Sequence, residues 1–360
     1  MADSDLAQLR QQIDSIDEQL LELLNQRAAV ALDVGKVKES DPNAIFFRPE
    51  REAQVLRKVK ELNKGPLDGE TVARLFREIM SACLALEEPM KIAFLGPEGT
   101  FTQQAALKHF GQSVKTLSLG TIDDVFREVA SGAVNYGVVP VENSTEGVVN
   151  HTLDSFMDTS LKICGEVDLR IHHHLLSGPQ TREESITRVY AHQQTFAQCR
   201  KWLDAHMPHL ERVAVSSNGE AAKRLRDEWN AVAIAGEMAA ELYGLKILRE
   251  KIEDWPDNTT RFIIIGREDV APSGKDKTSM LVRMKNQPGA LYHVLKPFND
   301  NGVDLTRVES RPSRSGNWSY VFFIDCLGHQ QDEALAKVIQ ELQQQALDVR
   351  LLGSYPVAEI

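Results

Sequence analysis

The sequence predicts a multidomain protein with three units: an all-α unit over residues 1–90, an α/β unit over 91–268 and a ferredoxin-like α+β (βαββαβ) unit over 278–360. Three observations support this division. A chain of 360 residues is long enough for two or three domains, each with its own core. The hydrophobic periodicity changes twice, from helical, to short apolar runs between helical segments, to a compact strand and helix series. Pro-containing segments at 87–90 and 269–276 separate the three stretches.

The composition excludes several classes of protein. Hydrophobic residues make up 42% and charged residues 26%, which is typical of a globular protein. No apolar stretch is long enough to span a membrane, and the formal net charge of −11 argues against a nucleic-acid or membrane-surface binder. Residues 1–5 are acidic, unlike a signal peptide, so we expect a cytoplasmic protein. Any small anion must then be held by a few well-placed cations.

The cysteines and histidines predict no metal site. The cysteines are far apart, without a Cys-x-x-Cys pair, so we expect reduced and mostly buried thiols at Cys83, Cys164, Cys199 and Cys326. His172 and His174 would share one face of a strand, but carboxylates at ligand spacing are lacking nearby. We interpret residues 172–174 as structural and expect neither a metal nor an organic cofactor.

The first unit begins with a long helix whose apolar face also carries cations. Arg27 occupies a gap in this face, and the same phase reaches Arg10 upstream and Lys38 downstream. The apolar members step by three and four along the chain: Ile13, Ile16, Leu20, Leu23, Val30 and Val34. Charged side chains are rarely buried without partners, so this face predicts a multiply charged anion as the counter-ion. The alternative is that the long aliphatic parts of the Arg and Lys side chains carry their charged groups from the helix to water.

Two shorter helices continue the pattern. The second, over about 50–62, has Arg51 as the upstream member of its apolar stripe, and the third, over about 72–86, is followed by Glu87. At a rise of 1.5 Å per residue, Arg27 and Lys38 are about 16 Å apart and can converge on one molecule, whereas Arg10 lies about 25 Å from Arg27. Arg10 can therefore join that site only from a second subunit, which predicts a dimer.

These residues carry a family resemblance. The series Arg10-x-x-Ile13-Asp14, Arg27, Val-Gly-x-Val-Lys ending at Lys38, and Arg51-Glu52 resembles the all-helical chorismate mutases. The resemblance implies an intertwined dimer that converts chorismate, a dicarboxylate, to prephenate. It implies that Arg10 of the partner subunit, Arg27 and Arg51 hold carboxylates, and that Lys38 and Glu87 bond the ether oxygen.

Glu87 stands where some relatives carry Gln. An ionised carboxylate would repel the ether oxygen, so Glu87 must be protonated to donate a hydrogen bond there. Burial favours the protonated form of a carboxyl group. We therefore expect mutase activity to fall as the pH rises past neutral.

The second unit has polar segments next to apolar runs. A strand over 91–95 leads into a Gly-containing turn and a helix, which suits an anion, although a plain turn is the alternative. A strand over 137–141 leads into the polar segment 142–147, and ligands of open α/β sheets bind at such strand ends. Residues 258–262 place polar side chains before the apolar run 263–265. These side chains are candidate site residues, and the alternative is that they only cap a strand.

Four separated motifs of this unit keep the order found in prephenate dehydratases. They are Gly-Pro-Glu-Gly-Thr-Phe at 96–101, Val-Pro-Val-Glu-Asn-Ser at 139–144, His192-x5-Gln198-Cys199 and Thr-Arg-Phe at 260–262. The resemblance implies two α/β lobes, with a cleft in which prephenate loses carbon dioxide and its ring hydroxyl to give phenylpyruvate. It implies that Thr260 donates or relays the proton, that Arg261 anchors a carboxylate, and that Glu142, Asn143 and Gln198 are polar contacts.

The third unit shows strands over 278–284, 304–311, 318–327 and 349–354 and helices over 288–302 and 332–345, an order that predicts a ferredoxin-like sandwich. A dimerisation module is the alternative to a ligand-binding one. Gly289-Ala290-Leu291-Tyr292 and Glu309-Ser310-Arg311-Pro312 resemble the ACT domain, which pairs with a second copy and binds L-phenylalanine. The resemblance implies feedback inhibition, with Gly289, Ala290, Leu291 and Ser310 in the site and Glu309 toward the ammonium group.

Together the resemblances imply a cytoplasmic, bifunctional chorismate mutase and prephenate dehydratase of phenylalanine biosynthesis. We expect a homodimer or a higher homo-oligomer that is inhibited by L-phenylalanine. One alternative is a monofunctional prephenate or arogenate dehydratase whose helices serve dimerisation, although the cations of the first unit argue against it. The other is a non-enzymatic sensor.

Overall fold

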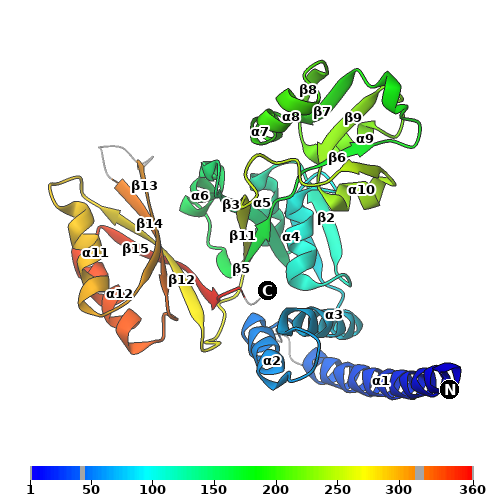
Figure 1. The fold of residues 1–360 in the computed structure, drawn as a ribbon. Helices are drawn as coiled ribbons and strands as arrows, with labels where there is room; N and C mark the ends of the chain where they lie inside the picture. The colour runs from blue at the N-terminus through cyan, green and yellow to red at the C-terminus, as the bar shows by residue number, and fades with distance from the viewer. Residues whose placement is uncertain (1, 41–44, 313–319, 359–360) are drawn as a thin grey trace.

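A computed structural model describes residues 2–40, 45–312 and 320–358 of the chain. Figure 1 shows a helical N-terminal unit beside the first lobe of a two-lobed α/β unit, with a third unit of one sheet and two helices against another side of that lobe. The predicted fold class is confirmed for all three units. No helix of the described residues is long and apolar enough to cross a membrane. All four cysteines are buried, as expected.

The N-terminal unit consists of α1 (Ala2–Glu39), α2 (Pro49–Leu62) and α3 (Gly69–Glu87). Helix α2 begins with a proline, whose missing N–H costs nothing at the first helical position. The side chain of Asp68 caps α3 by accepting a 2.8 Å hydrogen bond from the backbone N–H of Thr71. Gly35 near the end of α1 is buried, and its Cα faces Glu87 so closely that an added Cβ would lie 3.4 Å from it.

The apolar face of α1, which the sequence predicts to be buried in a protein that forms a dimer, is exposed in the single chain. In Figure 1 the N-terminal part of α1 projects beyond α2 and α3. Its large apolar side chains are accordingly exposed: Leu6, Leu9, Ile13, Ile16, Leu20, Leu21, Leu23, Leu24, Val30, Leu32, Val34 and Val37. The periodicity is real, but one copy of the described chain supplies no surface that covers this face.

The first lobe of the α/β unit is a six-stranded sheet in the order β2-β1-β3-β11-β5, with β4 paired to β3. Strands β1, β2 and β3 are parallel, and β11 runs antiparallel between β3 and β5. The strands are β1 (Lys91–Leu95), β2 (Lys115–Leu119), β3 (Tyr136–Asn143), β4 (Gly147–Val148), β5 (Lys162–Arg170) and β11 (Thr259–Gly266). The helices are α4 (Phe101–Phe110), α5 (Ile122–Ser131) and α6 (Asn150–Met157).

The second lobe is a five-stranded sheet in the order β10-β6-β9-β7-β8. The strands are β6 (His174–Ser177), β7 (Arg188–His192), β8 (Glu211–Val215), β9 (Ala231–Ala235) and β10 (Lys246–Arg249). The helices are η1 (Glu183–Ser185), α7 (Gln193–Gln198), α8 (Arg200–His206), α9 (Asn218–Arg224) and α10 (Glu237–Tyr243). The chain passes between the lobes twice, and backbone hydrogen bonds of 2.8 Å join the two crossings, from Ile252 to His173 and from Ile171 to Asn258.

The third unit has the predicted βαββαβ order. Its elements are β12 (Asp276–Met284), α11 (Ala290–Asp300), β13 (Leu305–Pro312), β14 (Tyr320–Leu327), α12 (Glu333–Gln345) and β15 (Asp348–Pro356). The sheet order β13-β14-β12-β15 is that of a ferredoxin-like fold, with β13 at an edge. One face of the sheet packs on the two helices around a core that includes Met280, Phe298, Ile324 and Leu342.

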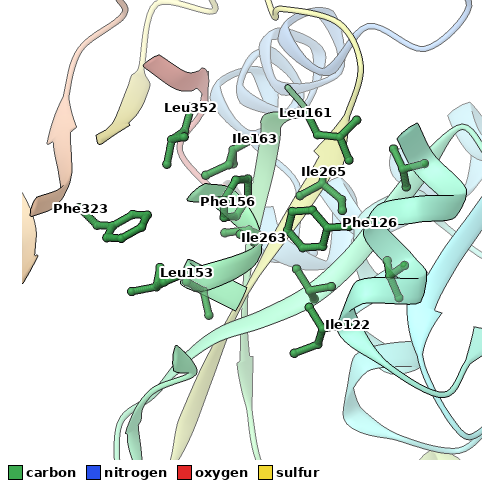
Figure 2. Close-up of a cluster of buried hydrophobic side chains, with 14 of the residues drawn as sticks. Ile122, Phe126, Leu153, Phe156, Leu161, Ile163, Ile263, Ile265, Phe323 and Leu352 are labelled. Atoms are coloured by element: carbon green, nitrogen blue, oxygen red, sulfur yellow. The ribbon is translucent and has the colours of Figure 1, made fainter. Parts of the chain in front are cut away.

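The other face of this sheet shares a hydrophobic core with the first lobe. Figure 2 shows Phe323 and Leu352 of the third unit beside Phe156 and Ile163 of the first lobe, and all four belong to one buried cluster. Gly353 has a φ of 151° and lies so close to β5 that a Cβ would be 2.2 Å from the carbonyl oxygen of Ile163. The sheet is therefore packed directly on the α/β unit.

Candidate active site

A cleft of about 560 Å³ lies between the two lobes of the α/β unit. It is lined by the ends of β1 and β3, the start of α4 and strand β11 from the first lobe, and by α7 and the start of α9 from the second. Asn143, Gln198 and Thr260, three of the residues predicted from the sequence, line it together. The structure thus brings them together from segments more than fifty residues apart in the chain.

Asn143 and Thr260 form a cross-strand pair at the end of β3 and the start of β11. The side-chain Nδ2 of Asn143 donates a 2.8 Å hydrogen bond to the hydroxyl oxygen of Thr260. The Oδ1 of Asn143 accepts hydrogen bonds from the backbone N–H groups of Thr145 and Glu146, at 2.9 and 3.0 Å, and these fix the orientation of the amide. Because the Thr260 oxygen is the acceptor, its own proton is available for a molecule in the cleft.

A hydrogen-bond network continues from this pair into the second lobe. Asn258 accepts from Asn143 at 2.8 Å and donates to the Oε1 of Gln198 at 3.3 Å. The Nε2 of His173 lies 2.7 Å from the same Oε1, so this ring nitrogen carries the proton. Burial lowers the pKa of His173, although the hydrogen bond to Gln198 works in the opposite direction. The network therefore joins the lobes through a neutral imidazole.

Asn258 and His173 are site residues that the sequence analysis missed. Asn258 stands two residues before the Thr-Arg-Phe motif, and its position at the start of the polar segment 258–262 was the available signal. His173 belongs to the three histidines interpreted as structural. Its burial and its bond to Gln198 depend on the crossing between the lobes, which no local pattern reveals.

The described residues that line the cleft include no Arg and no Lys; the titratable ones are Glu146, His173 and His192. The start of α4 lies in the lining, with Thr100, Phe101 and Thr102, and no side chain caps its first turn. Free backbone N–H groups at a helix start favour anions. Among the described residues of the lining, the groups that favour an anion are therefore backbone amides and hydroxyls, whereas the resemblance implies a guanidinium there.

Arg261 and Glu142 do not line the cleft. The resemblance implies that Arg261 anchors a carboxylate there and that Glu142 is a polar contact. Arg261 bonds Glu166 at 2.9 Å and Asp325 of the third unit at 2.5 Å. Glu142 forms an ion pair with Arg307 of the third unit at 3.3 Å. The physical reason is strand alternation, because residues next to Thr260 and Asn143 point to the opposite face of the sheet.

The helical unit brings together only part of its predicted site. The Nζ of Lys38 lies 3.1 Å from a carboxylate oxygen of Glu87, and both side chains are largely buried. Lys38 also donates to the backbone oxygen of Phe46 at 3.1 Å. Arg10, Arg27 and Arg51 are exposed. Arg10 and Lys38 lie near opposite ends of α1, about 42 Å apart at a rise of 1.5 Å per residue, so a single chain does not bring them together.

The two motifs of the predicted regulatory site lie at one end of the third unit's sheet. Gly289, with a φ of 81°, precedes α11, which starts with Ala290 and carries the exposed Leu291. Glu309 on β13 and Leu281 on β12 are both paired with Phe323 on β14, the strand that lies between them. The C-terminal ends of β12 and β13 therefore lie at the same end of the sheet. Ser310 is exposed on this edge strand, whereas Glu309 is half-buried.

Comparisons with known proteins agree with the three units. Family models match residues 92–270 (prephenate dehydratase), 9–88 (chorismate mutase type II) and 278–344 (ACT domain). The chain is 61% identical to the bifunctional chorismate mutase/prephenate dehydratase of Stutzerimonas stutzeri, over 99% of this chain and 100% of the relative. It is 62% identical, with the same coverage, to the protein of that name from Pseudomonas aeruginosa.

Solved structures of prephenate dehydratases resemble a large part of the chain. Prephenate dehydratase from Arthrobacter aurescens in complex with L-Phe is 34% identical, with a TM-score of 0.69 over 74% of this chain and 90% of that chain. The Staphylococcus aureus prephenate dehydratase is 27% identical, with a TM-score of 0.66 over 74% and 100%. The full-length relatives do not favour a monofunctional dehydratase with a helical dimerisation domain. The chain belongs to the family of bifunctional chorismate mutase/prephenate dehydratases.

Proposed function

We propose that the cleft between the lobes is the dehydratase site and that Thr260 serves the leaving hydroxyl group of prephenate. The observation that carries this assignment is the hydrogen bond from Asn143 to the Thr260 oxygen, which leaves the Thr260 proton free to be donated to a molecule in the cleft. Hydroxide is a poor leaving group, so a donor at this oxygen lowers the barrier in the transition state. The ring carboxylate leaves as carbon dioxide, the hydroxyl leaves as water after taking up one proton, and the ring becomes aromatic.

The side-chain carboxylate of prephenate needs positioning more than neutralisation. We assign it to the start of α4, where Thr100 and Thr102 line the cleft and the first-turn amides have no side-chain cap. Gln198, held by His173 and Asn258, is a polar contact from the second lobe. The absence of a cation from the described lining leaves the departing carboxylate without a tight counter-ion, which suits its conversion to neutral carbon dioxide.

The mutase site is completed by a second copy of the chain. The exposed apolar face of α1 supports a dimer in which α1 of each subunit covers the other. Arg10 of the partner subunit then joins Arg27, Lys38, Arg51 and Glu87 around chorismate. Holding the substrate compact, with a donor at the breaking C–O bond, is all that this rearrangement requires.

The third unit is proposed to bind L-phenylalanine and to inhibit prephenate turnover. Gly289, Ala290 and Leu291 at the start of α11 offer backbone groups to the carboxylate, and Glu309 and Ser310 lie on the strand toward the same end of the sheet. The related Arthrobacter aurescens dehydratase was solved with L-Phe. We also propose that the enzyme works in the cytoplasm as a homodimer or a higher oligomer.

One pair of assays tests the dehydratase assignment in the full-length protein. Thr260→Ala should abolish formation of phenylpyruvate from prephenate and leave the consumption of chorismate unchanged. Equal loss of both activities would contradict separate sites, and unchanged prephenate turnover would contradict the role of Thr260. Parallel assays of the unsubstituted enzyme with prephenate and arogenate establish which substrate it prefers.

A further inference from the structure

Two neighbouring cross-strand pairs of β3 and β11 face opposite sides of the sheet. Thr260 is paired with Asn143, and the next residues, Arg261 and Glu142, are paired with each other. The first pair lies in the cleft, and the second faces the ACT domain. Consecutive Cα atoms are about 3.8 Å apart, so a displacement of the second pair moves the first.

The ACT domain holds both members of the second pair. The Nη1 of Arg261 bonds Asp325 on β14 at 2.5 Å, and its Nη2 donates to the hydroxyl of Tyr355 on β15 at 3.0 Å. Arg307 on β13 pairs with Glu142 at 3.3 Å. Three strands of the ACT sheet therefore contact the strand pair that carries Asn143 and Thr260.

The contacts of Arg261 belong to a buried polar cluster. Ser279 donates to Asp325 at 2.6 Å and lies 2.7 Å from the hydroxyl of Tyr355. Glu166 on β5 accepts from both Arg261 and Lys277, at 2.9 and 2.7 Å. The side chains of Glu166 and Asp325 are 2% and 8% exposed. Removing one partner from such a cluster leaves a buried charge unpaired, so the geometry is strongly constrained.

We infer that Arg261 and Glu142 are positioning residues for the dehydratase reaction, through which the ACT domain sets the placement of Thr260 and Asn143. This inference rests on the proposed role of Thr260. It also connects the predicted regulatory site to the cleft, because Arg307 lies two residues before Glu309 on the same strand. A change in β13 therefore reaches Glu142, the direct neighbour of Asn143.

Two substitutions in the ACT domain test the inference without altering the cleft: Asp325→Asn and Arg307→Met. Each should lower kcat for prephenate on the order of 10- to 100-fold, as expected for a misplaced donor, with little change in KM. Chorismate turnover by the same preparations should stay unchanged. Arg261→Lys, which keeps the charge but not the planar fork, should give an intermediate kcat.

Asp154→Asn is the matched control, because Asp154 forms a 2.8 Å ion pair with Arg311 across the same interface but does not adjoin Asn143 or Thr260. It should leave kcat for prephenate within about twofold of the unsubstituted enzyme. An equal loss in Asp154→Asn would show that only domain docking matters, and would overturn the inference. Unchanged kcat in both Asp325→Asn and Arg307→Met would also overturn it.

The double variant Glu142→Arg/Arg307→Glu guards against effects of misfolding. It exchanges the positions of the two charges and so keeps an ion pair between β3 and β13. It should therefore recover much of the kcat that is lost in Glu142→Arg alone or in Arg307→Glu alone. Failure to recover, with an unchanged thermal midpoint, counts against the Glu142–Arg307 pair.

Thr260→Ala separates the two proposals. If Thr260→Ala abolishes turnover while the ACT variants do not lower kcat, only the positioning role is wrong; if Thr260→Ala stays active, both are wrong.

Discussion

Asn143 donates its 2.8 Å hydrogen bond to Thr260 across two strands that are more than a hundred residues apart in the chain. The direction of this bond matters, because the amide supplies the proton and leaves the threonine hydroxyl free to donate elsewhere.

The direction of this bond can be reversed by Asn143→Asp. A carboxylate of nearly the same size accepts the Thr260 proton, so the hydroxyl no longer donates to the substrate. We expect kcat for prephenate to fall about 100-fold, the usual cost of losing one transition-state donor. Steady-state assays check this, with chorismate turnover as the internal control. Retention of full prephenate turnover would show that the orientation of this hydroxyl is irrelevant.

Subunit exchange tests the shared mutase site. Arg10→Ala and Lys38→Ala should each abolish chorismate turnover, because each removes one contribution to every site. Mixing the two variants after reversible dissociation should restore about a quarter of the activity, since half of the dimers are mixed and each mixed dimer has one intact site. No restoration, with mixed dimers detected by mass spectrometry, would place Arg10 outside the site.

His109 should make the folded protein sensitive to acid. Burial, and to a smaller extent Arg77, lowers the pKa of His109 to about 3. Between that value and its ordinary pKa, the unfolded chain binds a proton that the folded chain does not. The free energy of unfolding therefore falls by about 1.4 kcal/mol for each pH unit below about 6.

Thermal midpoints of His109→Gln at neutral and mildly acidic pH check this sensitivity. The midpoint of the unsubstituted protein should fall more steeply on acidification than that of the variant. His209→Gln is the control, because His209 is exposed on the second lobe. Equal slopes for all three proteins would mean that His109 is protonated in the folded state.

Binding of L-phenylalanine and prephenate should be mutually antagonistic. If the ACT domain inhibits by weakening the productive cleft, then prephenate must weaken the binding of L-phenylalanine by the same factor. Calorimetric titration of Thr260→Ala allows the measurement, since this variant should not consume prephenate. We expect the affinity for L-phenylalanine to fall several-fold when prephenate is saturating. Equal affinity with and without prephenate would rule out thermodynamic linkage.

Local patterns predicted much of the fold. The steps of three and four along α1, the apolar run of β1 and the βαββαβ order of the ACT domain are all written in neighbouring residues. The motifs that contain Asn143, Gln198 and Thr260 were likewise visible, because polar segments beside apolar strands mark candidate sites.

Other features depended on distant segments. The sequence could not show that β11 returns from the second lobe to lie between β3 and β5, which places Asn258 and His173 in one network with Gln198. It indicated a dimer, but it did not show how much of the apolar face of α1 is exposed in a single chain, since periodicity indicates that a face is covered but not what covers it.

Arg261 shows most clearly the difference between what local sequence predicts and what the tertiary structure decides. The sequence by itself determined the family, the order of the domains and the presence of a guanidinium beside the threonine of the Thr-Arg-Phe motif. Only the tertiary structure decided that this guanidinium faces Glu166 and Asp325 of the ACT interface while Thr260 faces the cleft. The reason is that adjacent residues of a strand point to opposite faces, and what covers each face is set by the packing of separate domains.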